Sequence, residues 1–362
     1  MKATQLLHNL GQSIWLDNIT RDLLDCGTLK TYIDELSVTG LTSNPTIYNH
    51  AIKNSTAYGS AIRDKLAEGK AGEELFFELA LDDLTRAADL FRPIYDRTNG
   101  VDGWASLEVS PLLAYDTTKT LAAAKDLHAR AGRPNLLIKI PGTKEGLPAI
   151  EEAIFAGIPV NVTLLFSSDQ YLAAADAFLR GVERRIDAGL KPNVSSVASV
   201  FVSRWDAAVS GKVPANLNNK LGIAIAERTY RECRSLLGSP RWHRIYNAGA
   251  CPQRLLWAST GTKDPTASDI LYIKALAAPF TVNTMPEATL KALANHQELG
   301  SILPADGGDC EEVLSQFAKA GINVDALAAQ LQNEGAKSFV KSWNELISGL
   351  MPRGIAFKQT AG

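Results

Sequence analysis

Eight short apolar segments that alternate with stretches of helical periodicity constrain the fold of this chain more than any other feature of its sequence. The segments are rich in Val, Ile, Leu and Thr, as buried strands are. They span Ile14–Ile19, Gly40–Ile47, Ala105–Val109, Leu136–Ile140, Val160–Phe166, Ser196–Val202, Arg254–Ser259 and Phe280–Val282. Helical stretches include Leu75–Leu90, Thr117–Ala131, Gly146–Ala156, Asp169–Ala188 and Ala215–Leu237. This alternation predicts a parallel α/β sheet.

Eight such units over about 300 residues favour a closed (β/α)8 TIM barrel. An open doubly wound sheet normally carries a Gly-rich first turn, and neither GxGxxG nor GxxxxGK[ST] occurs here. The region Glu312–Leu350 has further helical periodicity, so we expect a C-terminal helical extension over about residues 300–350 that packs on the barrel. No repeat or linker divides the chain, which predicts a single domain over residues 1–362.

The composition argues against several classes of function. Lys and Arg total 37 against 39 for Asp and Glu, so the net charge of -2 gives no electrostatic reason to bind nucleic acid or an anionic membrane. No run approaches the roughly 18 apolar residues that a membrane span needs. Four separated cysteines without a CxxC pair or a signal peptide suggest a cytoplasmic protein. Five scattered histidines show no ligand spacing, so we predict no catalytic metal and no cofactor.

Lys139 places a charge inside a segment that is otherwise apolar, between Leu136–Ile138 and Ile140. Removing an ammonium from water is costly unless the group is paired, and burial commonly yields a neutral amine. A neutral amine can attack a carbonyl group and form a Schiff base. The alternative is a lysine at a strand end whose stem packs on apolar neighbours while its head reaches water.

Polar side chains lie near the carboxyl ends of seven predicted strands, where a TIM barrel gathers its active site. They are Asp17 and Asn18, Thr42 and Asn44, Glu108, Lys139, Asn161 and Thr163, Ser199 and Arg204, and Ser259 with Lys263. Each could have a structural role instead. Asp17 could cap the following turn, and Thr42 and Asn44 could stabilise the bend before Pro45. Taken together, the seven positions predict one functional site.

The segments that carry these residues resemble the motifs of transaldolases, in the class I Schiff-base aldolase superfamily. They are Trp15–Asp17, Leu41–Thr46, Ser106–Ser110, Leu137–Pro141, Asn161–Ser167 and Ser199–Arg204. The resemblance runs from about Leu10 to Trp343, and the chain length and the segment Leu255–Thr260 are similar to the long bacterial form. It implies a (β/α)8 barrel independently of the periodicity.

The resemblance also implies roles for individual residues. Lys139 matches the Schiff-base lysine, Asp17 the acid/base carboxylate, and Glu108 the carboxylate that works through a bound water. We expect Thr163 to hold this water. Residues expected at the substrate are Asn44, Thr42, Asn161, Ser199, Phe201, Arg204, Ser259 and Lys263. One departure concerns the phosphate. The second phosphate arginine of shorter family members falls near Gly261, so we expect Lys263 or Arg254 to replace it.

The implied activity is the reversible transfer of a dihydroxyacetone unit, in the non-oxidative pentose phosphate pathway. The donor would be sedoheptulose 7-phosphate or fructose 6-phosphate, and the acceptor glyceraldehyde 3-phosphate or erythrose 4-phosphate. One alternative is a fructose-6-phosphate-type aldolase that releases free dihydroxyacetone, and the other is a sugar-phosphate-binding barrel without catalysis. The chain length favours the transferase over the first, and the presence of Lys139, Asp17 and Glu108 disfavours the second. We expect a monomer or a homodimer.

Overall fold

Eight parallel strands close into a barrel in the computed structural model, which describes the backbone of residues 1–359 and the side chains of residues 1–350. The strands are β1 (Ser13–Leu16), β2 (Val38–Thr42), β3 (Trp104–Glu108), β4 (Leu136–Pro141), β5 (Val160–Leu165), β6 (Ser196–Phe201), β7 (Arg254–Ala258) and β8 (Val282–Met285). They follow one another in chain order, and β8 pairs with β1 to complete the ring. The predicted (β/α)8 TIM barrel is therefore confirmed.

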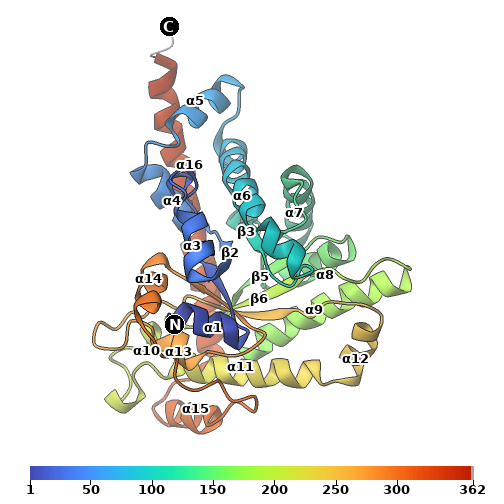
Figure 1. Cartoon of the computed structure of the whole chain (residues 1–362), viewed down its shortest axis with the longest axis vertical. Coiled ribbons are helices and arrows are strands. Elements are labelled where there is room, and N and C mark those ends of the chain that lie inside the picture. Colours follow the sequence, from blue (N-terminus) through green and yellow to red (C-terminus); the bar gives the residue numbers. More distant parts are fainter. Residues whose placement is uncertain (360–362) are drawn as a thin grey trace.

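Helices surround the barrel and connect its strands (Figure 1). They are α1 (Ala3–Leu10), α2 (Arg21–Asp25), α3 (Thr28–Leu36), α4 (Pro45–Asn54), α5 (Gly59–Ala67), α6 (Gly72–Arg97), α7 (Thr117–Ala131), α8 (Gly146–Phe155), α9 (Ser168–Asp187), α10 (Ser203–Val209), α11 (Leu221–Leu237), α12 (Pro240–Asn247), α13 (Leu271–Ala275), α14 (Glu287–Asn295), α15 (Cys310–Lys319) and α16 (Val324–Gln359), with short 3₁₀ turns η1 (Pro111–Leu113) and η2 (Ala215–Leu217). Within residues 1–359, no helix is both long and apolar enough to cross a membrane.

Inside the barrel, a layer of apolar side chains lies next to the polar side chains at the carboxyl ends of the strands. Alternate strand residues point to the same side, so Leu137 and Lys139 both face inward on β4. The apolar layer includes Trp104, Leu137, Val197 and Leu256, all buried. Gly40 makes room for it, because a Cβ at this position would lie 2.7 Å from the ring of Trp15. Polar side chains such as that of Lys139 lie beyond this apolar layer, toward the carboxyl ends of the strands.

The predicted second strand, Gly40–Ile47, is wrong in its second half. Strand β2 ends at Thr42, and α4 begins at Pro45. Asn44 caps this helix, since its side-chain oxygen accepts a hydrogen bond from the backbone N–H of Ile47 at 3.0 Å. Proline at the first helical position has the backbone φ that a helix needs. An N-cap followed by proline therefore ends the extended segment sooner than its apolar residues suggested.

Other predicted boundaries also shift. The first strand is shorter than Ile14–Ile19 and ends before Asp17, and the eighth begins at Val282 instead of ending there. Phe280 cannot belong to a strand, because its φ is +64°. The predicted helix Ala215–Leu237 is a 3₁₀ turn followed by α11, and the region Glu312–Leu350 contains two helices, separated near Gly321, which has a φ of +85°. The single domain over 1–362 stays a prediction, and residues 360–362 lie outside the described part.

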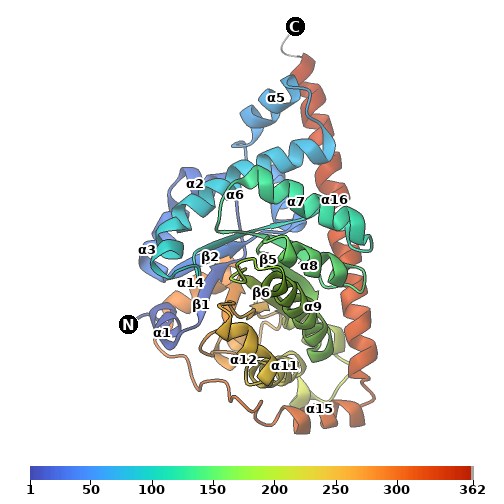
Figure 2. The same ribbon diagram turned by 90° about the vertical axis from the view of Figure 1, so that its right-hand side faces the viewer.

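Helix α16 runs beside the barrel along the long axis of the molecule (Figure 2). It packs against α4, α5, α6 and η1, and against strand β5 of the barrel. The indole N–H of Trp343 donates to Glu73 Oε1 at 2.8 Å, and the Trp343 ring meets Phe76 edge-on at 4.9 Å. Gln332 reaches the backbone carbonyls of Gly142 and Leu164, just beyond Lys139 and Thr163 in sequence. The helix therefore contacts the polar end of the barrel.

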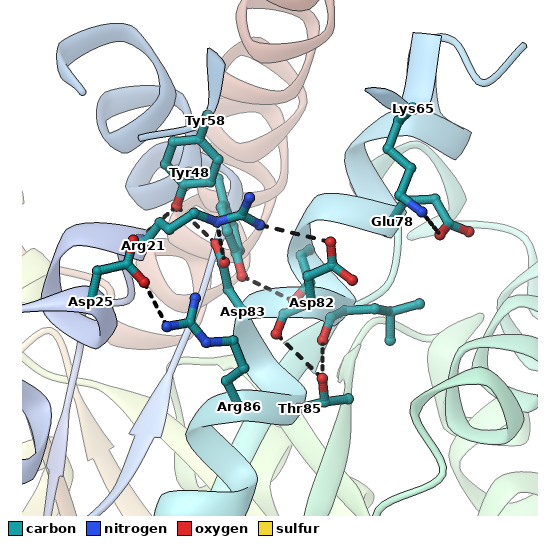
Figure 3. Close-up of polar contacts among 12 residues, drawn as sticks. Arg21, Asp25, Tyr48, Tyr58, Lys65, Glu78, Asp82, Asp83, Thr85 and Arg86 are labelled. Carbon is teal, nitrogen blue, oxygen red and sulfur yellow. Dashed lines mark hydrogen bonds and ion pairs between the residues drawn. The ribbon is translucent and has the colours of Figure 1, made fainter. Parts of the chain in front are cut away.

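A buried ion pair ties together the helices that follow the first two strands. Arg21 of α2 and Tyr58, the residue before α5, point toward the carboxylate of Asp83 on α6 (Figure 3). Arg21 Nε donates to Asp83 Oδ1 at 2.8 Å, and the Tyr58 hydroxyl donates to Oδ2 at 2.9 Å. The guanidinium also lies 4.9 Å from the centre of the Tyr58 ring. Since Arg21 lies four residues after Asp17, this cluster supports the segment that follows β1.

We expect Asp83→Ala to destabilise the protein by roughly 3–5 kcal/mol, because it leaves a largely buried guanidinium without its partner. The measurement is the free energy of unfolding from urea titration. Asp82→Ala is a matched control, since Asp82 faces the same arginine at 3.8 Å but its side chain is 49% exposed, against 0% for Asp83. The control should change stability by less than about 1 kcal/mol. Equal effects of the two substitutions would contradict a special role for the buried pair.

Candidate active site

A cavity of about 130 Å³ lies at the carboxyl ends of the strands. Its lining contains ten of the predicted site residues: Asp17, Thr42, Asn44, Lys139, Thr163, Ser199, Phe201, Arg204, Ser259 and Lys263. The two others, Glu108 and Asn161, are buried and hydrogen-bond to Lys139 and Ser199. The fold therefore brings these twelve predicted residues together, whereas Asn18 bonds to Glu287 and does not line the cavity.

Lys139 is held by two acceptors at the base of this cavity. Its Nζ donates to Glu108 Oε2 at 2.9 Å and to the backbone carbonyl of Ser43 at 3.1 Å. Glu108 and Lys139 are register partners on β3 and β4, which places their side chains next to each other. The two side chains are 3% and 6% exposed. The interpretation of Lys139 as a lysine whose head reaches water is therefore wrong.

Burial raises the pKa of Glu108, and the ammonium of Lys139 opposes this effect. One carboxylate oxygen, Oε2, is occupied by Lys139. The other, Oε1, is buried and has no hydrogen-bond partner among the described side chains and backbone, and the same holds for Oγ1 of Thr163. Buried polar atoms usually have partners, so these two atoms are free to bind a small polar group in the site.

Asp17 follows β1 and is positioned by threonines from the two neighbouring strands. Its backbone N–H donates to the carbonyl of Met285 at 2.8 Å, and Thr42 Oγ1 donates to Asp17 Oδ1 at 2.9 Å. Thr42 also contacts Thr284 Oγ1 of β8 at 2.7 Å. Burial raises the pKa of Asp17, while Lys139, Thr42 and Arg204 lower it. This is a second carboxyl group, close to Lys139 but not paired with it.

The strained backbone of β5 orients Thr163. The next residue, Leu164, has a φ of +59°, and the pairing of β5 with β6 is interrupted between Val162 and Leu165. A branched side chain rarely adopts this conformation, and such strain concentrates at functional sites. Two residues before Thr163 on β5, Asn161 donates to Ser106 Oγ at 3.1 Å and accepts from Ser199 Oγ at 2.7 Å. These bonds fix the polar side chains of β5 and β6.

Arg204 presents a guanidinium that no acidic side chain neutralises directly. It lies 4.9 Å from the ring centre of Phe201 and 5.8 Å from that of Phe339, and Phe201 stacks on Phe166. Within residues 1–350 it makes no hydrogen bond or ion pair, and burial lowers its pKa. A guanidinium that lies near two aromatic rings and has free donors in a cavity suits a bidentate anion such as phosphate.

Helix α10, which carries Arg204, is anchored by Asp206. The Asp206 carboxylate accepts hydrogen bonds from the backbone N–H groups of Leu221 and Gly222 at 2.9 and 3.2 Å. It also accepts one from the Tyr272 hydroxyl at 2.8 Å. Burial raises the pKa of Asp206 to about 6, although these donors lower it. The seven-residue helix is thereby tied to α11 and α13, which steadies Arg204.

Residues 14–350 match the family described as Transaldolase/Fructose-6-phosphate aldolase. The chain belongs to this family. Curated relatives named Transaldolase come from Frankia alni, 42% identical over 346 residues, and Thermobifida fusca, 43% identical over 352 residues. The aligned region covers 93% of both chains in the first case, and 95% of this chain and 96% of the relative in the second. A Nostoc protein named Transaldolase 2 is 38% identical over 359 residues, 94% of each chain. The resemblance inferred from the motifs is confirmed.

Of the two cations expected to replace the second phosphate arginine of the transaldolase family, only Lys263 lies at the cavity. The expectation for Arg254 is wrong. Arg254 begins β7, so its buried side chain lies at the opposite, amino-terminal end of the barrel. There it donates to Ser13 Oγ at 2.7 Å and to the carbonyls of Val101 and Thr281 at 2.9 Å. Its donors therefore stabilise the amino-terminal end of the barrel, which we call the barrel floor, and are not available to a substrate in the cavity.

Several residues of the site were missed by sequence reasoning. Thr284 lines the cavity, but the eighth strand was predicted to end two residues before it. Ser106 lies two residues before Glu108, so the period of β3 could have revealed its inward direction. Phe339 lies within the predicted helical region Glu312–Leu350 and was not among the predicted site residues. No local pattern shows that this helix lies across the cavity.

Proposed function

We propose that this protein is a transaldolase that transfers a dihydroxyacetone unit between sugar phosphates through a Schiff base on Lys139. The observation that carries the proposal is the buried Lys139, held by Glu108 and Ser43 at the base of a cavity that also holds a second carboxyl group and a free guanidinium. The family and the printed names of the relatives support it. A cytoplasmic role in the non-oxidative pentose phosphate pathway, as a monomer or homodimer, belongs to the same proposal.

In the first step, the Lys139 amine attacks the ketose carbonyl and the carbinolamine loses water to give a protonated imine. Glu108 takes the proton from Nζ and, through a water that Thr163 holds, returns one to the departing oxygen. The contact of Glu108 Oε2 with Nζ supports this role, and so do the unpartnered atoms Glu108 Oε1 and Thr163 Oγ1. The balance is one water lost for one imine formed.

In the second step, Asp17 removes the proton of the C4 hydroxyl group, and the C3–C4 bond of the ketose breaks. Its electron pair moves toward the imine, which leaves an enamine on Lys139 and releases an aldose phosphate. An acceptor aldose phosphate is then attacked by the enamine carbon, and Asp17 returns a proton to the new hydroxyl. The bond from Thr42 to Asp17 supports this assignment, because it orients the carboxylate and leaves its Oδ2 for substrate.

The phosphate groups of donor and acceptor are proposed to bind Arg204 and Lys263, with Ser199 and Ser259 adding hydroxyl groups. Both cations line the cavity, and Arg204 has free donors. Asn44, Asn161 and Thr42 are proposed to hold the sugar hydroxyls near Lys139. Phe201 supports Arg204 through its ring face. Binding of phosphorylated sugars would then depend mainly on these charges.

Arg204→Ala should raise the KM for fructose 6-phosphate by about 10- to 100-fold, the effect of losing charge-assisted hydrogen bonds worth roughly 1.5–3 kcal/mol. Turnover of the unphosphorylated donor fructose should change much less. The measurement is initial-rate kinetics with both donors and a common acceptor. Arg204→Lys keeps the charge and should recover part of the loss. Equal effects on the two donors would show that Arg204 does not bind the phosphate.

The direct test is reduction with borohydride in the presence of fructose 6-phosphate, followed by peptide mapping. We expect a dihydroxyacetone-sized adduct on Lys139 that disappears when erythrose 4-phosphate is added. An adduct accompanied by rapid release of free dihydroxyacetone would favour the aldolase, which the family description also includes. An unmodified Lys139 would favour a sugar-phosphate-binding barrel.

A further inference from the structure

One wall of the cavity comes from helix α16 and not from the barrel. Phe339 of this helix is 4% exposed and lines the cavity. The centre of its ring lies 5.5 Å from Lys139 Nζ and 5.8 Å from the guanidinium carbon of Arg204. Most of the other lining residues are polar. A large apolar ring thus lies close to Lys139, which would bond to the substrate, and to Arg204, which would bind its phosphate.

Contacts on both sides of Phe339 hold α16 in place. Toward the start of the helix, Gln332 Nε2 donates to the carbonyls of Leu164 at 2.9 Å and Gly142 at 3.1 Å. At Gly335 the helix approaches the barrel so closely that a Cβ would lie 3.0 Å from Leu164 and 3.2 Å from Arg204 Nη1. Toward its end, Trp343 is bonded to Glu73. Positions 332, 335, 339 and 343 share one helix face, so Phe339 is a fixed wall.

We propose that Phe339 is a specificity-determining residue that keeps water from the three-carbon intermediate, so that this unit passes to an aldose acceptor. The inference rests on the proposed function. The imine carbon is bonded to Nζ, so a ring centred 5.5 Å from Nζ limits the room for water on that side. Glu108, bonded to the same Nζ, and the unpartnered atoms Glu108 Oε1 and Thr163 Oγ1 keep polar groups in the site for Schiff-base formation.

The two fates of the intermediate differ in what they require. Release of free dihydroxyacetone needs a proton on the enamine carbon and then one water at the imine carbon, which returns the Lys139 amine. Transfer needs an aldehyde at the enamine carbon and a proton from Asp17 to its oxygen, and then one water at the imine carbon, which releases the new ketose and returns the Lys139 amine. Only the first fate admits water as the proton source for the carbon. Exclusion of water by an apolar ring therefore slows release without slowing attack on the acceptor.

The experiment compares Phe339→Ala and Phe339→Leu with the wild-type protein. Fructose 6-phosphate is supplied with and without erythrose 4-phosphate, and the ratio of free dihydroxyacetone to transferred three-carbon units is measured. We expect this ratio to rise by at least about tenfold in Phe339→Ala and by less in Phe339→Leu, which leaves a smaller gap. Phe317→Leu is the matched control, because Phe317 is fully buried on α15 and does not line the cavity. Its ratio should equal that of the wild type.

An unchanged ratio in Phe339→Ala, with release and transfer slowed together, would overturn the inference and leave Phe339 a packing residue. If Phe339→Ala does not fold, Phe339→Leu decides, and a ratio equal to that of Phe317→Leu overturns the inference. The borohydride adduct on Lys139 distinguishes failure of this inference from failure of the proposed function. If the wild-type protein forms the adduct but the Phe339 variants leave the ratio unchanged, the proposed function stands and only this inference is overturned. If the wild-type protein forms no adduct, both the proposed function and this inference are overturned.

Discussion

Replacement of Lys139 by methionine is expected to lower turnover by about 10⁴-fold or more, the scale seen when a covalent nucleophile is removed. Methionine keeps much of the buried stem, but it has no amine to form a Schiff base. Borohydride reduction with fructose 6-phosphate should then label no residue. The measurements are single-turnover kinetics and peptide mapping. Label on Lys263, the other lysine of the cavity, would move the Schiff base to that residue.

The same substitution also removes the partner of a buried carboxylate, so its effect on stability must be separated from its effect on chemistry. Loss of one partner of a buried ion pair costs roughly 3–5 kcal/mol. In the double variant Lys139→Met/Glu108→Gln, neither charge remains, and most of that stability should return. Activity should not return. A double variant that regained turnover would show that the single substitution had only damaged the fold.

Asp17→Asn is expected to lower turnover by about 10²- to 10⁴-fold, the usual contribution of a positioned general base. Asparagine preserves the acceptor for Thr42 but cannot take the C4 proton. Since Lys139 and Glu108 are untouched, borohydride should still trap an adduct on Lys139. Asn18→Ala is a neighbouring control, because Asn18 bonds to Glu287 and does not line the cavity. Wild-type turnover in Asp17→Asn would contradict the assignment of the base.

The pH dependence gives an independent measure of the same role. Burial raises the pKa of Asp17 above its usual 3.8. A base must be ionised to act, so kcat/KM should fall as the pH decreases through this raised pKa, at a higher pH than for an exposed aspartate. Glu108, whose pKa burial also raises, contributes to the same acid limb. Asp17→Asn should lose the part of the limb that belongs to Asp17.

Much of the site could be predicted from the sequence, because in a parallel barrel the position of a residue along its strand determines the end at which it lies. Asp17, Glu108, Lys139, Thr163 and Ser199 occur at the carboxyl ends of apolar segments, and the fold gathers them at one cavity. The period of two in a strand also determines which side chains face inward. These are local properties, and the sequence records them directly.

The sequence by itself determined the barrel, the order of its strands and the polar end at which the predicted site residues meet. Only the tertiary structure decided that Phe339 forms a wall beside Lys139. Phe339 lies 200 residues after Lys139 in the chain. A helix with an apolar face could pack at many places on the outside of a barrel, and its own periodicity does not distinguish them. Its position depends on distant partners, the carbonyls of Gly142 and Leu164 and the side chain of Glu73, which come together only in the folded chain.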